Sequence, residues 1–363
     1  MADITLDHLT KVFDKTVVAV ADLTIQIPTG CVVSLLGPSG CGKTTTMRMI
    51  AGLEKPTQGR ILIDGKDVTH LQPKERDIAM VFQLPVNYDT LSAYDNLAFP
   101  LIAKKVGKKE IERQIEKTTE LFEIPKAVLK ERITNLGLSD RQRISLAHAF
   151  IIPRNLYLLD EPLSNLDPKG REDLRIKIKD VQMKIGQTIL YVTHDQSEAL
   201  TLADKIAIMR DGKLLQYSDT QEIFDHPQND FVGWFLGNPG MNFIPCQYRK
   251  EKDNYILDAG VFQYRTDAIK FEAPMPAERR LRLGIRPEHV QISAEKKPGW
   301  IHSRCEVIEP IGNRLLLFQK IGEVEIVVKT SRNVPISEKA DAWLNFPAHH
   351  VRLFDNDTGD AIA

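Results

Sequence analysis

One stretch, residues 31–44, constrains the fold of this chain more than any other. It begins with six mostly apolar residues that predict a buried strand. It continues through a glycine-rich loop into a helical pattern that ends at Gly52. The loop has the spacing Gly-x-x-x-x-Gly-Lys-Thr, with its fixed positions at Gly37, Gly42, Lys43 and Thr44. This spacing, between a strand and a helix, is the Walker A pattern of phosphate-binding loops.

The residue types in this loop suit a phosphate chain. Glycine at positions 37 and 42 lets the backbone approach phosphate oxygens without a Cβ in the way. The N–H groups of the loop and the N-terminus of the helix form a positively polarised nest, while Lys43 reaches the outer phosphates and the Thr44 hydroxyl holds Mg²⁺. We therefore expect nucleotide contacts from Gly37, Pro38, Ser39, Gly40, Cys41, Gly42, Lys43, Thr44 and Thr45.

The composition limits the class of protein. A chain of 363 residues is long enough for two domains, each with its own core. The net charge is −1, with Lys and Arg mixed among acidic residues, so we expect no nucleic-acid partner. The four cysteines are scattered without a CxxC pair, which favours reduced thiols in a cytosolic protein. No signal peptide and no stretch long enough to cross a bilayer is found, so we expect any membrane role to come through a partner.

Three further predicted strands end in polar residues that suit the same site. Residues 156–159 form an apolar run followed by Asp160, which can bind Mg²⁺, and Glu161, which can polarise the attacking water. His194 follows the apolar run 188–193, and we expect it at the γ-phosphate. Gln83 follows the run 77–82; it is either a polar strand edge or a ligand of Mg²⁺ that senses the γ-phosphate.

The remaining segments complete a two-domain prediction. Residues 4–27 alternate as antiparallel strands do, and Phe13 between them either stacks on an adenine or belongs to the core. Residues 86–150 look like a helical insertion whose lysines form a solvated face. Short strands broken by Pro and Gly after residue 240 predict a regulatory barrel of the OB type. The fold class is thus α/β, a P-loop NTPase cassette over residues 1–240 followed by an OB-like β-barrel over residues 241–363.

These motifs, in this order and spacing, resemble those of ABC transporter ATPases. The chain is similar, more narrowly, to the maltose-type carbohydrate importer ATPases. That similarity rests on the Walker A sequence and on four more segments that extend it over essentially the whole chain: Tyr94–Phe99, Pro239–Phe243, Gly284–His289 and Leu353–Gly359.

The resemblance implies roles and partners. It makes Phe13 the adenine-stacking aromatic, Glu161 the catalytic base and His194 the switch histidine, with ATP and Mg²⁺ as cofactors. The metal ligands it implies are Thr44, Gln83 and Asp160. It implies a dimer of ATPase subunits under two integral-membrane permease subunits, which dock near residues 83–95. An extracellular solute-binding protein supplies the solute, and the ATPase lies peripherally at the cytoplasmic face of the inner membrane.

One motif departs from the family. Before the basic helix start at residues 141–143 the family has Leu-Ser-Gly-Gly-Gln, whereas this chain reads Leu-Gly-Leu-Ser-Asp at residues 136–140. Gly137 lacks the phosphate-contacting hydroxyl, and Asp140 brings a carboxylate that suits its own helix N-terminus but repels an anion. Loss of one hydrogen bond to a charged group costs about 1.5–3 kcal/mol. Alternatively the register slips and Ser139 serves. The altered signature predicts a heterodimer with a second, unlike ATPase.

Three readings of the function follow. The first is an ATPase that powers uptake of a carbohydrate or polyol. Residues 83–90 and the altered signature resemble those of a family branch that serves glycerol-like or polyol uptake, and this resemblance implies a glycerol-like solute. The second is a soluble ABC ATPase outside transport; such proteins usually carry two cassettes or a coiled-coil insertion, which this sequence lacks. The third is a regulatory subunit without catalysis, against which the intact Lys43, Asp160, Glu161 and His194 argue.

Overall fold

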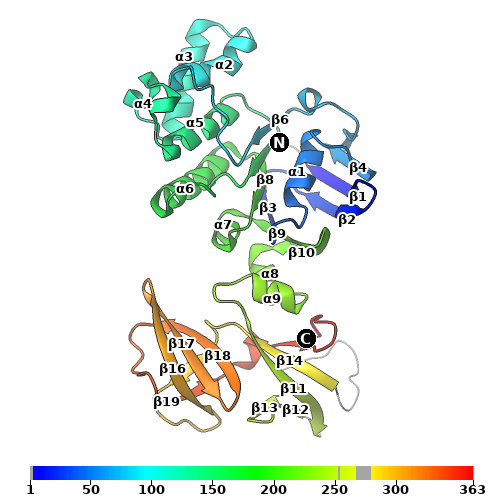
Figure 1. Cartoon of the computed structure of the whole chain (residues 1–363), viewed down its shortest axis with the longest axis vertical. Helices are drawn as coiled ribbons and strands as arrows, with labels where there is room; N and C mark the ends of the chain where they lie inside the picture. The colour runs from blue at the N-terminus through cyan, green and yellow to red at the C-terminus, as the bar shows by residue number, and fades with distance from the viewer. Residues whose placement is uncertain (1–2, 252–253, 267–278, 363) are drawn as a thin grey trace. The chain divides into compact units, whose positions relative to one another are not determined.

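A computed structural model describes residues 3–251, 254–266 and 279–362 and divides the chain into two compact units, residues 1–220 and 221–363 (Figure 1). Within the described residues, no helix combines the length and the apolar character needed to cross a membrane.

A six-stranded sheet forms the centre of the first unit, in the order β10-β9-β3-β8-β7-β6. The pairs β3–β8, β3–β9, β8–β7 and β7–β6 are parallel, so these strands end at one edge of the sheet. Every residue of β3, β7 and β8 is buried, which explains their nearly continuous apolar sequences. The strands are β3 (Val32–Leu36), β6 (Ile78–Val81), β7 (Leu156–Asp160), β8 (Thr188–Thr193), β9 (Lys205–Arg210) and β10 (Lys213–Asp219).

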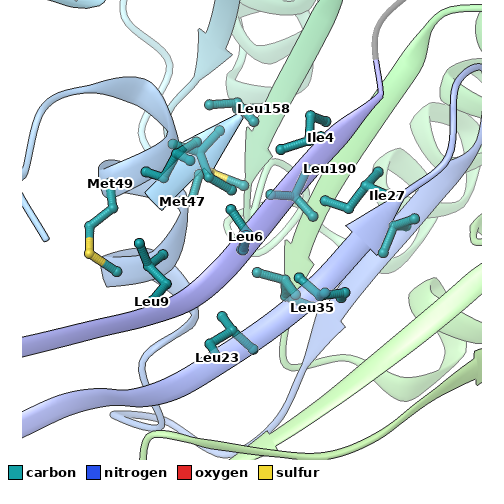
Figure 2. Close-up of a cluster of buried hydrophobic side chains, with 14 of the residues drawn as sticks. Ile4, Leu6, Leu9, Leu23, Ile27, Leu35, Met47, Met49, Leu158 and Leu190 are labelled. Carbon is teal, nitrogen blue, oxygen red and sulfur yellow. The ribbon is translucent and has the colours of Figure 1, made fainter. Parts of the chain in front are cut away.

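A second sheet of the first unit has the order β2-β1-β4-β5 and is antiparallel. Its strands are β1 (Ile4–Phe13), β2 (Val17–Ile27), β4 (Gln58–Ile63) and β5 (Lys66–Asp67). Figure 2 shows Leu6 of β1 among Met47 of helix α1 (Lys43–Ala51), Leu35 of β3 and Leu190 of β8, which all belong to one buried cluster. This shared core fixes the helix that follows the Walker A loop against both sheets.

The predicted helical insertion is confirmed. It consists of α2 (Ala93–Ala103), α3 (Lys108–Leu121), α4 (Lys126–Lys130), the 3₁₀ turn η2 (Ile133–Asn135) and α5 (Leu138–Phe150), which Figure 1 shows grouped together. Ile111 and Ile115 of α3 and the adjoining Phe122 are buried, whereas the lysines of α3 lie on its exposed face. The other helices of this unit are η1 (Pro73–Glu75), α6 (Pro168–Ile185) and α7 (Gln196–Leu202).

The second unit begins with α8 (Thr220–Asp225, its first residue in the first unit) and α9 (Asp230–Phe235) and continues as two antiparallel five-stranded sheets with a common core. One sheet has the order β13-β12-β11-β14-β20 and the other β15-β19-β16-β17-β18. The short strands predicted after residue 240 were at residues 243–246, 281–285, 304–309, 315–319 and 325–329, and they lie within β11, β14, β16, β17 and β18; the other five strands of the two sheets were not predicted. The strands are β11 (Asn242–Glu251), β12 (Asn254–Asp258), β13 (Gln263–Thr266), β14 (Arg279–Ile285), β15 (Gln291–Ser293), β16 (Ile301–Ile311), β17 (Arg314–Ile321), β18 (Val324–Ser331), β19 (Asp341–Asn345) and β20 (Arg352–Asp355), with the 3₁₀ turn η3 (Ala348–His350).

The compact units divide at residue 220, twenty residues before the domain boundary expected from sequence. The reason is Arg286, only 2% exposed, whose guanidinium donates to the backbone carbonyls of Phe224, Gly233 and Leu236. These bonds attach residues 224–236 to the β-sheet unit. The assignment of residues 1–240 to ATPase function and 241–363 to regulation concerns function and stays a prediction.

Candidate active site

The Walker A loop is shaped by two close backbone approaches. A Cβ on Gly37 would lie 2.2 Å from the carbonyl oxygen of Met209, and one on Gly42 would lie 2.3 Å from that of Ala19. Gly42 also has a φ of +102°, in the left-handed region that favours glycine. Larger residues at these two positions would displace the loop from β9 or β2.

Lys43 places a positive charge inside the loop. The side chain is 5% exposed, and its Nζ donates to the carbonyl oxygens of Gly37 at 2.8 Å and Pro38 at 2.9 Å. The Cys41 thiol lies 3.7 Å from the same Nζ, and burial raises the pKa of Cys41 above its usual value, so that thiol stays neutral. Among the described residues the Lys43 ammonium contacts neutral groups and no carboxylate, so its charge can attract a phosphate chain.

Asp160 and Thr44 meet at the end of β7. The Thr44 hydroxyl donates to Oδ1 of Asp160 at 3.2 Å. Burial raises the pKa of Asp160, the Thr44 hydrogen bond lowers it, and the neighbouring charge of Glu161 raises it again. A carboxylate and a hydroxyl are hard oxygen ligands of the kind that Mg²⁺ prefers, and a cation would offset the cost of burying the carboxylate. The pair therefore fits the predicted metal.

Glu161 lies between Gln83 and His194. Its Oε2 atom is 3.1 Å from Nδ1 of His194 and accepts a hydrogen bond from Nε2 of Gln83 at 3.3 Å. Its backbone has a φ of +44°, which a non-glycine residue adopts at a cost of about 1–3 kcal/mol. The Glu161 N–H donates to the Val192 carbonyl at 2.9 Å and holds this geometry. Three predicted site residues thus come together from the ends of three parallel strands.

The loop that carries His194 is held by a buried carboxylate that sequence reasoning missed. Glu198 of α7 is 3% exposed, and its Oε2 accepts hydrogen bonds from the hydroxyls of Tyr191 and Thr193, each at 2.8 Å. The Thr193 hydroxyl in turn accepts from the Asp195 N–H at 2.9 Å. Both neighbours of His194 therefore belong to one network. The signal in the sequence was the position of Glu198, four residues after His194.

The altered signature begins a helix. Gly137 is the N-cap of α5, and Leu138, its first residue, is 43% exposed. Arg141 donates from Nε to the Leu136 carbonyl at 2.9 Å and from Nη2 to the Thr134 carbonyl at 2.7 Å, which ties the segment to the preceding turn. The Ser139 hydroxyl lies 3.2 Å from the position that a Cβ on Gly170 would take, so it is directed toward α6 of its own chain.

Phe13 is half-buried at the end of β1 and pairs with Val17 across the hairpin. The Nζ of Lys11 lies 4.7 Å from the centre of its ring. This strand pair continues to Ala19, the residue that Gly42 approaches, so the hairpin adjoins the Walker A loop. The roles of Phe13 at adenine and of Gln83 at the metal stay predictions.

Comparison with family models matches three consecutive parts of the chain. Residues 20–164 match the ABC transporter model, residues 237–290 the MalK OB fold domain, and residues 283–354 the TOBE domain. Among solved structures, the dimeric ATP-binding cassette MJ0796, in a post-hydrolysis state with ADP and Pi, is 27% identical with a TM-score of 0.54 and covers 60% of this chain and 98% of its own. A match to cbiO1 from Clostridium perfringens at 24% identity, over 61% of this chain and 90% of that one with a TM-score of 0.58, supports the fold.

Curated relatives match over the full length. The sn-glycerol-3-phosphate import ATP-binding protein UgpC of Psychromonas ingrahamii is 38% identical and covers 100% of this chain and 96% of its own. The trehalose/maltose import ATP-binding protein MalK of Thermococcus litoralis is 37% identical and covers 100% of both. With the cassette, the Walker A loop and the OB and TOBE domains all present, this chain belongs to the ABC importer ATPases, the ATP-hydrolysing family of UgpC and MalK.

Proposed function

We propose that this ATPase powers the uptake of a carbohydrate or polyol through an ABC importer, with a glycerol-like solute as the narrower candidate. The observation that carries the proposal is the position of the Glu161 carboxylate. Its Oε2 atom lies 3.1 Å from Nδ1 of His194 and accepts a hydrogen bond from Gln83, at the edge of the parallel sheet where the Walker A loop begins. The UgpC and MalK relatives are named for the import of sn-glycerol-3-phosphate and of trehalose and maltose, which supports the choice of transport and of solute class.

In this proposal each residue has one task in ATP hydrolysis. Lys43 and the loop N–H groups bind the phosphates, and Phe13 stacks on the adenine. Thr44, Asp160 and Gln83 would hold Mg²⁺, which supplies charge neutralisation at the β- and γ-phosphates. Glu161 accepts a hydrogen bond from the attacking water and polarises it for in-line attack. His194 orients Glu161 and the γ-phosphate.

An exposed apolar surface supports a permease partner. Around the predicted docking segment 83–95, several large apolar side chains are exposed by 38–68% of their area: Phe82, Leu84, Val86, Tyr88, Phe99 and Ile102. The Tyr88 and Phe99 rings lie 4.6 Å apart, which joins the loop after β6 to α2. Large exposed apolar patches on a soluble protein are typical of binding sites. We assign it to the two integral-membrane subunits, which would hold this chain peripherally at the cytoplasmic face of the inner membrane.

The altered signature supports a heterodimer. In ABC dimers each signature segment closes over the nucleotide of the other subunit. The exposed Leu138 and the carboxylate of Asp140 disfavour that contact in this chain, whereas its own Walker A site is intact. A partner ATPase with a Leu-Ser-Gly-Gly-Gln signature would complete one competent ATP site, and this chain would close a second, weak one.

The test is affinity purification of the tagged chain from native membranes, followed by mass spectrometry and ATP turnover. The transport proposal expects integral-membrane subunits, a second ATPase and a solute-binding protein, with hydrolysis stimulated by that protein and its solute. Recovery of an active ATPase without any membrane protein would favour a soluble ABC ATPase. Recovery of a complex whose hydrolysis does not depend on Lys43 would favour a regulatory subunit.

A further inference from the structure

A small cavity of about 180 Å³ is lined by residues of the second unit, and none of the residues proposed for ATP hydrolysis belongs to its lining. Its lining includes Asp225 of α8, Arg286 and His289 after β14, His349 and His350 of η3, and Arg352 of β20. Pockets for drug-sized ligands have volumes of about 300–1,000 Å³. The cavity is therefore too small for a nucleotide and suits an ion or a very small metabolite.

The cavity is lined by two guanidinium groups and one carboxylate, and the carboxylate forms no ion pair with either guanidinium among the described residues. Arg286 is 2% exposed and donates to backbone carbonyls, and Arg352 likewise donates to the carbonyls of Asp225 at 3.0 Å and His349 at 3.1 Å. Neither guanidinium forms an ion pair in the part of the chain that the structure describes. The one lining carboxylate, Asp225, accepts a hydrogen bond from the Gln221 side chain instead. Buried charge of this kind is costly unless it is paired.

Three imidazole rings add unused donors. The rings of His289 and His350 stack with their centres 3.7 Å apart, and that of His349 lies 4.0 Å from that of His350. None of the three rings has a hydrogen-bond partner among the described residues. A neutral imidazole keeps one N–H donor, so each ring can donate to a ligand.

A metal ion does not fit this histidine cluster. Over the described residues, no group of three or more His, Cys, Asp or Glu side chains is arranged to hold one. Two guanidinium groups beside the rings would repel a cation as well. The same groups are favourable for an anion, because charge-assisted hydrogen bonds from guanidinium and imidazole to an oxyanion are short and strong.

We propose that this cavity is a binding site for a small oxyanion, held by the N–H groups of His289, His349 and His350 and by a terminal nitrogen of Arg352. Over the residues that the structure describes, the one contact of that nitrogen is a long one, 3.5 Å, with Nε2 of His226. The candidate ligands all contain a compact group whose negative charge is spread over two or more oxygens. This group is tetrahedral in phosphate and sulfate and planar in a carboxylate. The site does not depend on the proposed transport function.

Binding should tighten as the pH falls. Burial lowers the pKa of His289 and of His350. Nearby charges add to this: Arg352, His289 and His349 lower the pKa of His350, Arg286 and His349 lower that of His289, whereas Asp225 raises both and Glu288 raises that of His289. A bound anion favours the imidazolium form and raises both pKa values. By linkage, acidification below the usual histidine range near 6.5 strengthens binding.

The test is isothermal titration calorimetry of the full chain with sulfate, phosphate and acetate at constant ionic strength, with chloride as the background anion. His350→Phe and His289→Phe retain a planar ring for stacking but remove the donor. His302→Phe is the matched control, since His302 pairs with Asp341 at 3.2 Å and lies outside the cavity. Thermal melting of each variant in chloride checks that it folds.

We expect at least one oxyanion to bind the unaltered chain and the His302→Phe control equally. Binding should weaken about tenfold in each cavity variant and should tighten as the pH falls below ~6.5. The preferred anion distinguishes a phosphate-type from a carboxylate-type ligand. The proposal is overturned if no oxyanion binds more tightly than chloride, or if the folded His289→Phe and His350→Phe variants bind as well as the control does.

Discussion

The Nδ1 atom of His194 lies 3.1 Å from the Oε2 atom of Glu161, although the two residues are carried by different strands. Glu161 follows β7 and His194 follows β8, and the bond from the Glu161 N–H to the Val192 carbonyl, 2.9 Å long, fixes the two strand ends to each other. A shift of either strand end would therefore move both the base and the histidine that orients it. The predictions below test this relationship and the groups around it.

Replacement of Glu161 by Gln should preserve ATP binding and lower the turnover by orders of magnitude. The amide retains the size of the side chain and one acceptor oxygen but cannot act as a base. Turnover and nucleotide affinity are measured in the assembled complex, with Glu172→Gln as the control, because Glu172 is an exposed residue of α6 that pairs with Arg175. Undiminished hydrolysis in Glu161→Gln would remove Glu161 from the role of base.

Of the two hydroxyl groups that donate to Glu198, we expect that of Thr193 to affect catalysis and that of Tyr191 to affect mainly stability. Thr193→Val and Tyr191→Phe each remove one hydrogen bond to Glu198, but only Thr193 also accepts from the Asp195 N–H beside His194. Each loss should cost about 1–3 kcal/mol of folding free energy.

We expect Thr193→Val to lower kcat more than Tyr191→Phe does, with little change in ATP affinity in either. Denaturant unfolding gives the stability of both variants, and single-turnover kinetics gives the chemical step. Equal kcat values in two variants of equal stability would show that Glu198 supports the fold and does not position His194.

Replacement of Asp160 by Asn should stabilise the nucleotide-free chain while it weakens Mg²⁺-dependent ATP binding. Burial raises the pKa of Asp160, so the folded state binds the proton more tightly than the unfolded state does. The charged form therefore costs stability once the pH exceeds the usual aspartate pKa of about 3.9, and this cost is complete above the raised folded-state pKa.

The asparagine variant should accordingly melt at a higher temperature at neutral pH, and the difference should disappear below pH ~4. A gain of about 1 kcal/mol corresponds to a rise in Tm of ~2–4 °C in a unit of this size. A neutral-pH Tm equal to or below that of the unaltered chain would show that the carboxylate is well solvated or paired in the folded state.

Restoration of Ser-Gly-Gly-Gln at residues 137–140 should change transport less than Glu161→Gln does, because in the proposed heterodimer this segment closes the weak ATP site. The matching measurement is the subunit content of the purified transporter, which should hold two different ATPase chains in equal amounts. A native complex with two copies of this chain and no other ATPase, which hydrolyses ATP at ordinary importer rates, would show that Gly137–Asp140 works as a signature.

Most of the candidate site was predictable from the sequence because it depends on local patterns. The Walker A loop needs a strand, two close-approach glycines and a helix in succession, and these are adjacent along the chain. The carboxylates at 160 and 161 and His194 were identified because each follows an apolar run, and the carboxyl ends of parallel strands meet at one edge of a sheet. The strands β3, β7 and β8 were also predictable, because a parallel strand buried on both faces is a nearly continuous apolar run in the sequence.

The tertiary structure alone decided what depends on contacts between distant residues. No local pattern predicts that the Arg286 guanidinium donates hydrogen bonds to the carbonyls of Phe224 and Leu236. These bonds attach the segment after residue 220 to the second unit, so the boundary between the units lies at residue 220. Likewise, no local pattern predicts that the ring of His289 stacks on the ring of His350, sixty-one residues later, with the ring centres 3.7 Å apart. The strands β12, β13 and β15 are too short to carry a clear alternation of apolar and polar residues. β15 pairs with β19, which lies far away in the sequence, and such a pairing becomes favourable only when the neighbouring strand is already in place.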